Sequence, residues 1–170
     1  MTAFVVDTNV PVVANGRSEQ ADPDCVLACV DALASIVDGG IIVLDDAMLI
    51  LSEYLNNLQL RGQPGPGDAF LKWLWSVQAD PRHCERVRVT PRQGVEDDFE
   101  EFPNVPELED FDRSDRKFVA VALASRHKPP ILNAVDSDWW RFVQPLRRHG
   151  IRIRNLCPGI VEGGAQTFGA

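Results

Sequence analysis

The chain has 170 residues and is 45% apolar, which is enough for one domain with a full hydrophobic core. No apolar run approaches the roughly 18 to 20 residues that span a bilayer, and the N-terminus lacks a basic region followed by a cleavable apolar one. We therefore expect a globular cytoplasmic protein with no membrane association, and a net charge of −8 argues against a polyanionic partner unless the charges are segregated.

The first half of the chain alternates short apolar runs with amphipathic segments. Residues 3–6 are too short and too β-branched for a buried helix and predict a strand that ends at Asp7. Asp22 or Asp24 can cap the helix that follows, and Gly39 and Gly40 end it. The expected elements are strands over residues 3–6 and 41–44 and helices over 25–37, 45–60 and 68–78.

The second half continues the alternation after an acidic loop or insertion at residues 91–111. The expected elements are strands over 86–90, 131–135 and 151–155 and helices over 112–127 and 137–148. Strands that alternate with helices predict a single three-layer α/β domain with a mostly parallel central sheet. The domain is expected to cover residues 1–157, and the Gly-rich segment 158–170 is expected to be a flexible tail.

Charges are segregated in this second half. Residues 113–154 hold ten Lys and Arg against three acids, which are Asp115, Asp136 and Asp138. Such a basic segment either borders a site that attracts phosphate or forms a solvated helix face. Residues 93–112 instead hold nine acids and no Lys or Arg: Glu96, Asp97, Asp98, Glu100, Glu101, Glu107, Glu109, Asp110 and Asp112. The candidates for guiding a phosphate backbone are Arg116, Lys117, Arg141 and Arg147.

The four cysteines show no CxxC spacing. Cys25 and Cys29 can share a helix face, but with Cys84 and Cys157 they do not form a zinc signature. Reduced, mostly buried thiols are the expectation.

Four acids stand where a strand ends or where a helix presents an edge: Asp7, Glu53, Asp115 and Asp136. The parallel arrangement predicts that Asp7 and Asp136 emerge at the same edge of the sheet. Carboxylates about 4 Å apart repel by roughly 4 kcal/mol near a protein surface, so a shared site needs a cation or raised pKa values. Hard oxygen ligands without sulfur favour Mg²⁺ or Mn²⁺.

Each acid also has a purely structural interpretation. Asp7 suits a turn, and Asp136 or Asp138 can cap the helix that follows. Asp112 and Asp115 form a plausible capping pair, and Glu53 suits an ordinary helix surface. These interpretations weaken jointly, because independent accidents would have to reproduce one spatial pattern.

Four short segments contain the candidate acids: FVVDTN at residues 4–9, LSEYL at 51–55, DRKFVAVA at 115–122 and NAVDSDW at 133–139. Together, and in this order, they resemble the PIN-domain nucleases. The resemblance implies a parallel sheet flanked by helices, with Asp7, Glu53, Asp115 and Asp136 as catalytic and metal-binding residues and Asn9 as a polar helper. It also implies metal-dependent cleavage of single-stranded RNA. Many relatives are VapC-type toxins that form homodimers and are held inactive by an antitoxin protein.

The chain departs from the family pattern near its fourth acid. Ala134 and Trp139 stand where the family often has Thr and Phe, so Asp138 is an alternative metal ligand to Asp136, and Asp112 is likewise an alternative to Asp115. The acidic insertion is longer than a minimal toxin needs. One hypothesis is that its negative charge occupies the basic side of the site and restrains activity.

The predicted chemistry is hydrolysis of a phosphodiester with one or two metal ions and no side-chain nucleophile. A phosphatase with an aspartyl nucleophile would need a second Asp where this chain has Asn9, and a receiver-like domain would need its acidic pair after the first strand. The main alternative is a catalytically idle PIN-like module that binds RNA or a protein.

Overall fold

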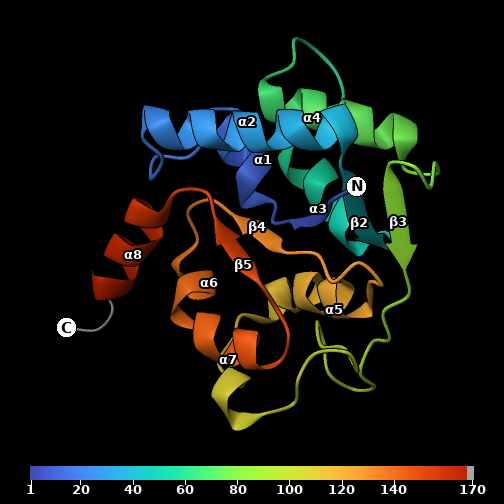
Figure 1. Cartoon of the computed structure of the whole chain (residues 1–170), viewed down its shortest axis with the longest axis vertical. Helices are drawn as coiled ribbons and strands as arrows, with labels where there is room; N and C mark the ends of the chain where they lie inside the picture. The colour runs from blue at the N-terminus through green and yellow to red at the C-terminus, as the bar shows by residue number, and fades with distance from the viewer. Residues whose placement is uncertain (168–170) are drawn as a thin grey trace.

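Five short segments form strands that pair only in parallel, in the order β3-β2-β1-β4-β5. The computed structural model describes residues 1–167, and these fold into a single α/β domain (Figure 1). The expected parallel α/β architecture is therefore confirmed. The strands are β1 Ala3–Val6, β2 Ile41–Asp45, β3 Cys84–Val87, β4 Ile131–Asn133 and β5 Ile153–Asn155.

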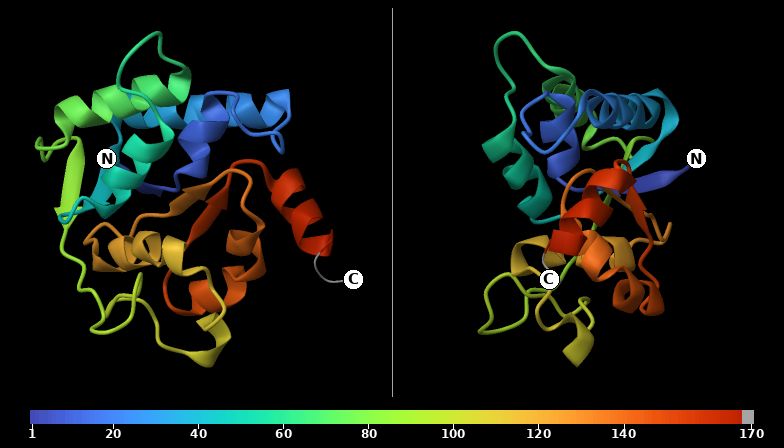
Figure 2. Two further views of the ribbon diagram at one scale, coloured as in Figure 1. Left: turned by 180° about the vertical axis from the view of Figure 1, so that it is seen from behind. Right: turned by 90° about the vertical axis from the view of Figure 1, so that its left-hand side faces the viewer.

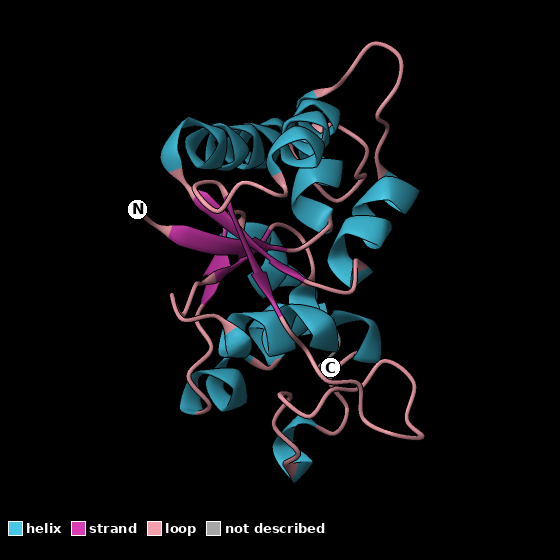
Figure 3. Cartoon of the chain, turned by 90° about the vertical axis from the view of Figure 1, so that its right-hand side faces the viewer, coloured by secondary structure: helices cyan, strands magenta, loops and turns pink. Residues whose placement is uncertain are grey.

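Helices cover both faces of this sheet. They are α1 Asn9–Ala14, α2 Pro23–Gly39, α3 Leu49–Asn57, α4 Pro66–Val77, α5 Arg116–Ala124, α6 Ser137–Arg141, α7 Val143–Arg148 and α8 Pro158–Thr167, with 3-10 turns η1 Pro106–Leu108 and η2 Arg113–Asp115. Helices α1, α2 and α4 pack together on one side, and α5, α6 and α7 lie on the other (Figures 1 and 2). The strands form the layer between them (Figure 3). Helix α3 contacts both β2 and α5.

The order of the strands creates a switch point between β1 and β4. The chain runs outward from β1 to β2 and β3, returns to place β4 on the other side of β1, and continues outward to β5. Val5 pairs with Ile131 and Val6 with Leu132, so the two strands end side by side. Ligands of open α/β sheets bind beyond the carboxyl ends of the strands at such a point.

Local sequence explains how helix α2 is placed. Its N-cap Asp22 accepts a hydrogen bond from the backbone N–H of Cys25 at 2.8 Å, and Pro23 occupies the first position. The buried residues Cys25, Cys29, Leu33 and Ile36 recur at helical spacing and form the inner face. Of the two candidate N-cap residues, Asp22 and Asp24, it is Asp22 that caps the helix.

The acidic segment 91–111 packs into the core as an irregular loop. Phe102 and Phe111 are buried and stack at 5.7 Å between ring centroids. The buried guanidinium of Arg116 lies 4.4 Å above the Phe102 ring and forms an ion pair with Asp98 at 3.0 Å. Burial raises the pKa of Asp98, but the hydrogen bonds from Arg116 and from the N–H of Phe99 outweigh it, and the pKa lies below its usual value. The segment is thus held by both apolar and ionic contacts.

The pairing with Asp98 does not support the predicted role of Arg116 in guiding a phosphate backbone. Its side chain is 8% exposed, and its guanidinium also donates to the carbonyl oxygens of Glu109 at 2.9 Å and of Leu108 at 3.4 Å. A charge that is already paired inside the fold is not available to a polymer outside it.

Some predicted boundaries differ from the structure. The strand expected at residues 86–90 lies at Cys84–Val87, and the helix expected over 137–148 is divided at Phe142 into α6 and α7. Helix α1 was not predicted, because its six residues form no long apolar period.

Part of the segment 158–170, for which a flexible tail is expected, forms helix α8. Pro158 stands at the start of this helix, Val161 is buried, and the helix packs against α6. These tertiary contacts outweigh the low helix propensity of its glycines. The last part of the expected tail, 168–170, lies outside the described residues.

Cys25 and Cys157 form a disulfide, which contradicts the expectation that all four cysteines are reduced. The two residues are 132 positions apart, so no local spacing could indicate the bond, and their Cα atoms lie 5.2 Å apart. Cys29 and Cys84 are free and buried, as expected. Disulfides persist mainly in oxidising compartments, so the bond does not support the expected cytoplasmic location. Within residues 1–167 no helix is both long and apolar enough to cross a bilayer.

Reduction of this disulfide is expected to lower the free energy of unfolding by about 3–5 kcal/mol, because the bond closes a loop long enough to restrict the unfolded chain strongly. Urea unfolding of the oxidised and reduced protein measures the difference. The double variant Cys25→Ser/Cys157→Ser should show no response to reductant, and Cys84→Ser should respond as the wild type does. An unchanged midpoint on reduction of the wild type would contradict the expectation.

Candidate functional site

Asp7 lies directly after β1, at the switch point of the sheet, and is 5% exposed. One carboxylate oxygen, Oδ1, accepts a hydrogen bond from the backbone N–H of Asn9 at 2.8 Å, as in an Asx turn. The other, Oδ2, accepts from the indole Nε1–H of the fully buried Trp139 at 2.8 Å. The two bonds fix the direction of the carboxylate.

Asp136 follows β4 and forms the N-cap of α6, where its Oδ1 accepts from the N–H of Asp138 at 2.9 Å. Asp115 ends η2 and directly precedes α5, and it is 9% exposed. Asp7 therefore lies near Asp115 and Asp136, more than a hundred positions away in sequence, because β1 and β4 are neighbours and α5 packs across both strands.

The structure brings together three of the four predicted acids. One carboxylate oxygen from each of Asp7, Asp115 and Asp136 lies within 4.8 Å of the others. Oxygen ligands of a single Mg²⁺ or Mn²⁺ lie at comparable separations, because each metal–oxygen bond is about 2.1 Å long. The set contains oxygen donors only, and it therefore suits a hard divalent cation.

The burial and close approach of the three acids raise their pKa values. Burial, with smaller contributions from the charges of Asp136 and Glu53, raises the pKa of Asp7 to about 7 in spite of its two hydrogen bonds. Burial and the charges of Asp7, Asp136 and Asp112 raise the pKa of Asp115 to about 9. The pKa of Asp136 is also raised, mainly by burial. A bound cation would reverse these shifts, because it stabilises the ionised carboxylates.

Glu53, the fourth predicted acid, lies beside this group and is already paired. Its Oε1 accepts from the hydroxyl of Thr8 at 2.6 Å, and its Oε2 lies 2.5 Å from the ammonium of Lys117. The Glu53 side chain is 31% exposed, so it stands at the solvent side of the buried acids. Its charge nevertheless contributes to the raised pKa of Asp7.

Asn9 and Asn133 connect the carboxyl ends of the central strands. The Asn9 amide donates to Asn133 Oδ1 at 2.9 Å, and Asn9 Oδ1 accepts from the N–H of Ala134 at 2.8 Å. Asn133 in turn donates to the carbonyl of Asp136 and to Oδ1 of Asn155, each at 2.8 Å. The side chain of Asn9 therefore supports the site without facing the acids as a ligand.

Three residues of this framework were not among the predicted site residues: Thr8, Asn133 and Trp139. Asn133 has a recognisable signature, since a buried amide at the end of an apolar strand needs partners. Nothing in the sequence indicates that Trp139, which is fully buried in the core, also donates to an acid.

Asp112 and Asp138, the two alternative metal ligands, are not part of the group formed by Asp7, Asp115 and Asp136 in the described residues 1–167. Asp112 is exposed and caps η2 by accepting from the N–H of Ser114 at 2.9 Å. Asp138 contributes its backbone N–H to Asp136. Of the remaining basic candidates, Arg141 and Arg147 are exposed, whereas Lys117 is largely covered by its pair with Glu53.

Comparisons of this chain with protein-family models, with curated proteins and with solved structures found no significant match. The chemistry of the site must therefore be inferred from its own residues.

Replacing Asp115 with asparagine is expected to stabilise the metal-free protein at alkaline pH. The pKa of Asp115 is about 9 in the folded state, whereas its ordinary value is 3.8. Between pH 3.8 and pH 9 the folded protein therefore binds more protons than the unfolded chain, and its stability falls as the pH rises through this range. The asparagine side chain has no charge to bury, so the variant should exceed the wild type by on the order of 1–3 kcal/mol at pH 9 and by less at pH 5.

Urea unfolding in the presence of EDTA across this pH range measures the effect. Asp38→Asn, at an exposed position of α2, is the matched control and should follow the wild type. A wild-type protein that gains stability relative to Asp115→Asn as the pH rises would refute the assignment.

Proposed function

We propose that this chain is a divalent-metal-dependent nuclease of the PIN type that hydrolyses phosphodiester bonds of single-stranded RNA. The observation that supports this proposal is the convergence of Asp7, Asp115 and Asp136 at the switch point, where burial raises the pKa of all three. A fold that keeps such a group without a cation stores electrostatic repulsion, and a bound cation relieves it.

The three carboxylates would hold Mg²⁺ or Mn²⁺, and when bound the metal lowers the pKa of a water molecule and stabilises negative charge on the phosphate. Trp139 and the N–H of Asn9 orient the Asp7 carboxylate, and the N–H of Asp138 orients Asp136. These hydrogen bonds leave the acids little freedom to move apart. Preorganisation of this kind reduces the free energy needed to assemble the reactive geometry.

Glu53 stands at the solvent side of the three acids, and its pair with the largely covered Lys117 supplies one charge of each sign. In the proposed reaction Lys117 is positioned to exchange its contact with Glu53 for one with a phosphate oxygen, which would release Glu53 toward the metal site. Exposed Arg141, Arg147 and Trp140 offer contacts to the remainder of a polynucleotide. The proposal also includes an antitoxin protein that would hold the site inactive and the formation of a homodimer, both of which rest on the family resemblance alone.

A catalytically idle binding module is the second candidate, and the pairing of Glu53 favours it. With Thr8 and Lys117 on its two oxygens, Glu53 is not free to join the other acids. If Glu53 keeps these two contacts when RNA is present, the module would bind RNA or a protein partner without cutting. Metal binding and cleavage, measured separately, distinguish the two functions.

Cleavage of a labelled single-stranded RNA by the purified protein is the direct test. We expect cutting with Mn²⁺ or Mg²⁺, none with EDTA, and a loss of at least about 100-fold in Asp7→Asn, which corresponds to roughly 2.7 kcal/mol of transition-state stabilisation. Asp38→Asn should cut as the wild type does. A folded protein that does not cut under any metal condition would favour the idle module.

Metal binding should release protons, because the raised pKa values leave the acids partly protonated at pH 7. Calorimetric titration with Mn²⁺ in two buffers of different ionisation enthalpy should show release of about one to two protons per ion. Asp115→Asn should release about one proton fewer. Absence of Mn²⁺ binding to the wild type would contradict the metal site itself, whereas binding without cleavage would support the second candidate.

A further inference from the structure

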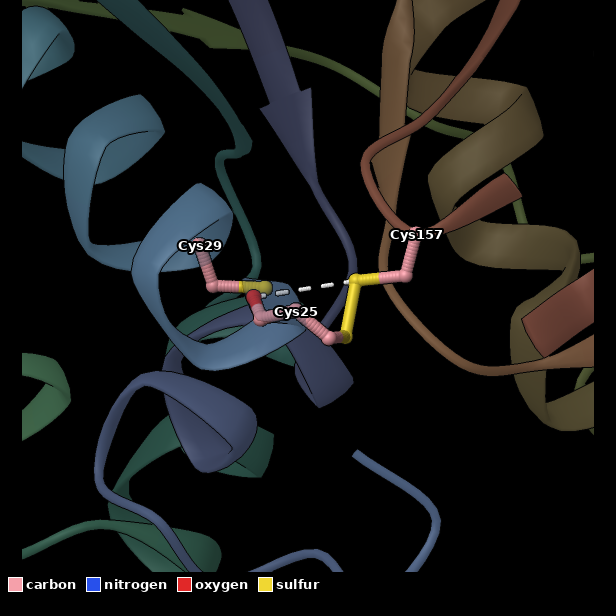
Figure 4. A group of neighbouring side chains, drawn as sticks. All are labelled: Cys25, Cys29 and Cys157. Carbon is pink, nitrogen blue, oxygen red and sulfur yellow. Dashed lines mark hydrogen bonds between the residues drawn. A yellow bond between two sulfur atoms is a disulfide. The ribbon is translucent and has the colours of Figure 1, made fainter. Parts of the chain in front are cut away.

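Three of the four cysteines meet where helix α2 touches the connection from β5 to α8 (Figure 4). Their three sulfur atoms lie within 4.8 Å of one another, and Cys25, Cys29 and Cys157 are all buried. Cys25 and Cys29 are four positions apart on α2 and so share a face, and Cys157 directly precedes α8. The remaining cysteine, Cys84, belongs to β3 and lies outside this cluster.

The disulfide uses only two of these sulfurs, and the third points at the bond (Figure 4). Burial raises the pKa of the Cys29 thiol to about 12, so Cys29 stays protonated and is a poor nucleophile toward the neighbouring disulfide. Thiol–disulfide exchange within the cluster therefore does not involve Cys29. A ligand that contacts all three sulfurs would have to come from outside the chain.

The disulfide is accessible from one side. A cavity of about 440 Å³ opens beside the bond and is lined in part by Asp22 and Asp24. It gives a reductant access, and its carboxylates attract cations.

We propose that Cys25, Cys29 and Cys157 bind one thiophilic divalent cation such as Zn²⁺ when the disulfide is reduced, and that the cation then replaces the disulfide as the link between α2 and α8. Two molecules of a small thiol supply two electrons and two protons to the Cys25–Cys157 bond and leave as their own disulfide. Binding of the cation releases up to three protons, because the three thiols become thiolates.

The geometry fits this exchange. Tetrahedral Zn²⁺ with bonds of about 2.3 Å to sulfur separates its sulfur ligands by roughly 3.8 Å. The free sulfur of Cys29 already lies within 4.8 Å of the other two, and the bonded pair must move apart once it is reduced. The fourth position is left to a water molecule, since the cavity opens beside Cys25 and Cys157.

Titration of the reduced protein with Co²⁺ tests the proposal. The disulfide is reduced with a phosphine, the phosphine is removed without air, and Co²⁺ is added to the full chain. We expect a sulfur-to-cobalt charge-transfer band and the visible bands of four-coordinate cobalt, which saturate at one ion per chain and vanish when Zn²⁺ is added. Oxidised protein should show no charge-transfer band. Carboxylates give no such band either, so the result is independent of the acidic site.

Cys29→Ser is the decisive variant, because it retains the disulfide of the oxidised state and removes one sulfur from the reduced site. Its reduced form should bind Co²⁺ at least about tenfold more weakly than the wild type. Cys84→Ser removes a buried free thiol outside the cluster and should bind as the wild type does. Reduced wild type without a charge-transfer band, or Cys29→Ser with wild-type affinity, would overturn the proposal.

If the reduced chain is unfolded before metal is added, circular dichroism provides the second measurement. Zn²⁺ should then restore the folded signal of the wild type and of Cys84→Ser but not of Cys29→Ser. Equal recovery in all three proteins, or recovery in none, would also overturn the proposal.

Discussion

The parallel pairing of β1 with β4 is the constraint on which the candidate site depends. It places Asp7 beside the segment that carries Asp136, and the amide pair Asn9 and Asn133 locks the two strand ends together. Helix α5 crosses the same strands and delivers Asp115. The proximity of these acids is therefore imposed by the backbone. Buried together, they are neutralised either by protons, as their raised pKa values show, or by a cation.

The segregation of charge along the sequence has a structural explanation as well as a functional one. Asp98 of the acidic segment pairs with Arg116 inside the fold, and Glu107 pairs with Arg148 at the surface. Part of the basic segment is thus neutralised by the acidic one, and restraint of activity by the insertion stays a prediction. The buried rings of Phe102 and Phe111 show that the insertion is also part of the core. Deleting it would remove packing together with charge and would not isolate a regulatory effect.

Sequence patterns predicted the features whose causes are local. Apolar runs located the central strands, and the capping residue Asp22 located the start of α2. The convergence of Asp7 and Asp136 followed from the rule that parallel strands end at one edge, and Asp115 was expected beside them because it stands at the edge of a helix. What could not be predicted depends on long-range contacts: the Cys25–Cys157 bond, the burial of Arg116 and the ordering of α8 against α6. Trp139 is the most instructive case, because the phenylalanine expected from the resemblance has no N–H to donate to Asp7.

The disulfide also divides the chain topologically. Residues 25–157 form a covalently closed ring that contains four of the five strands, whereas β1, with α1, lies on the open N-terminal arm. The central strand of the sheet is thus the one strand that no covalent ring retains. A pulling force applied at the N-terminus would reach β1 before it reached the ring. Mechanical extension would then withdraw Asp7 from the site first, while the closed ring resisted further extension.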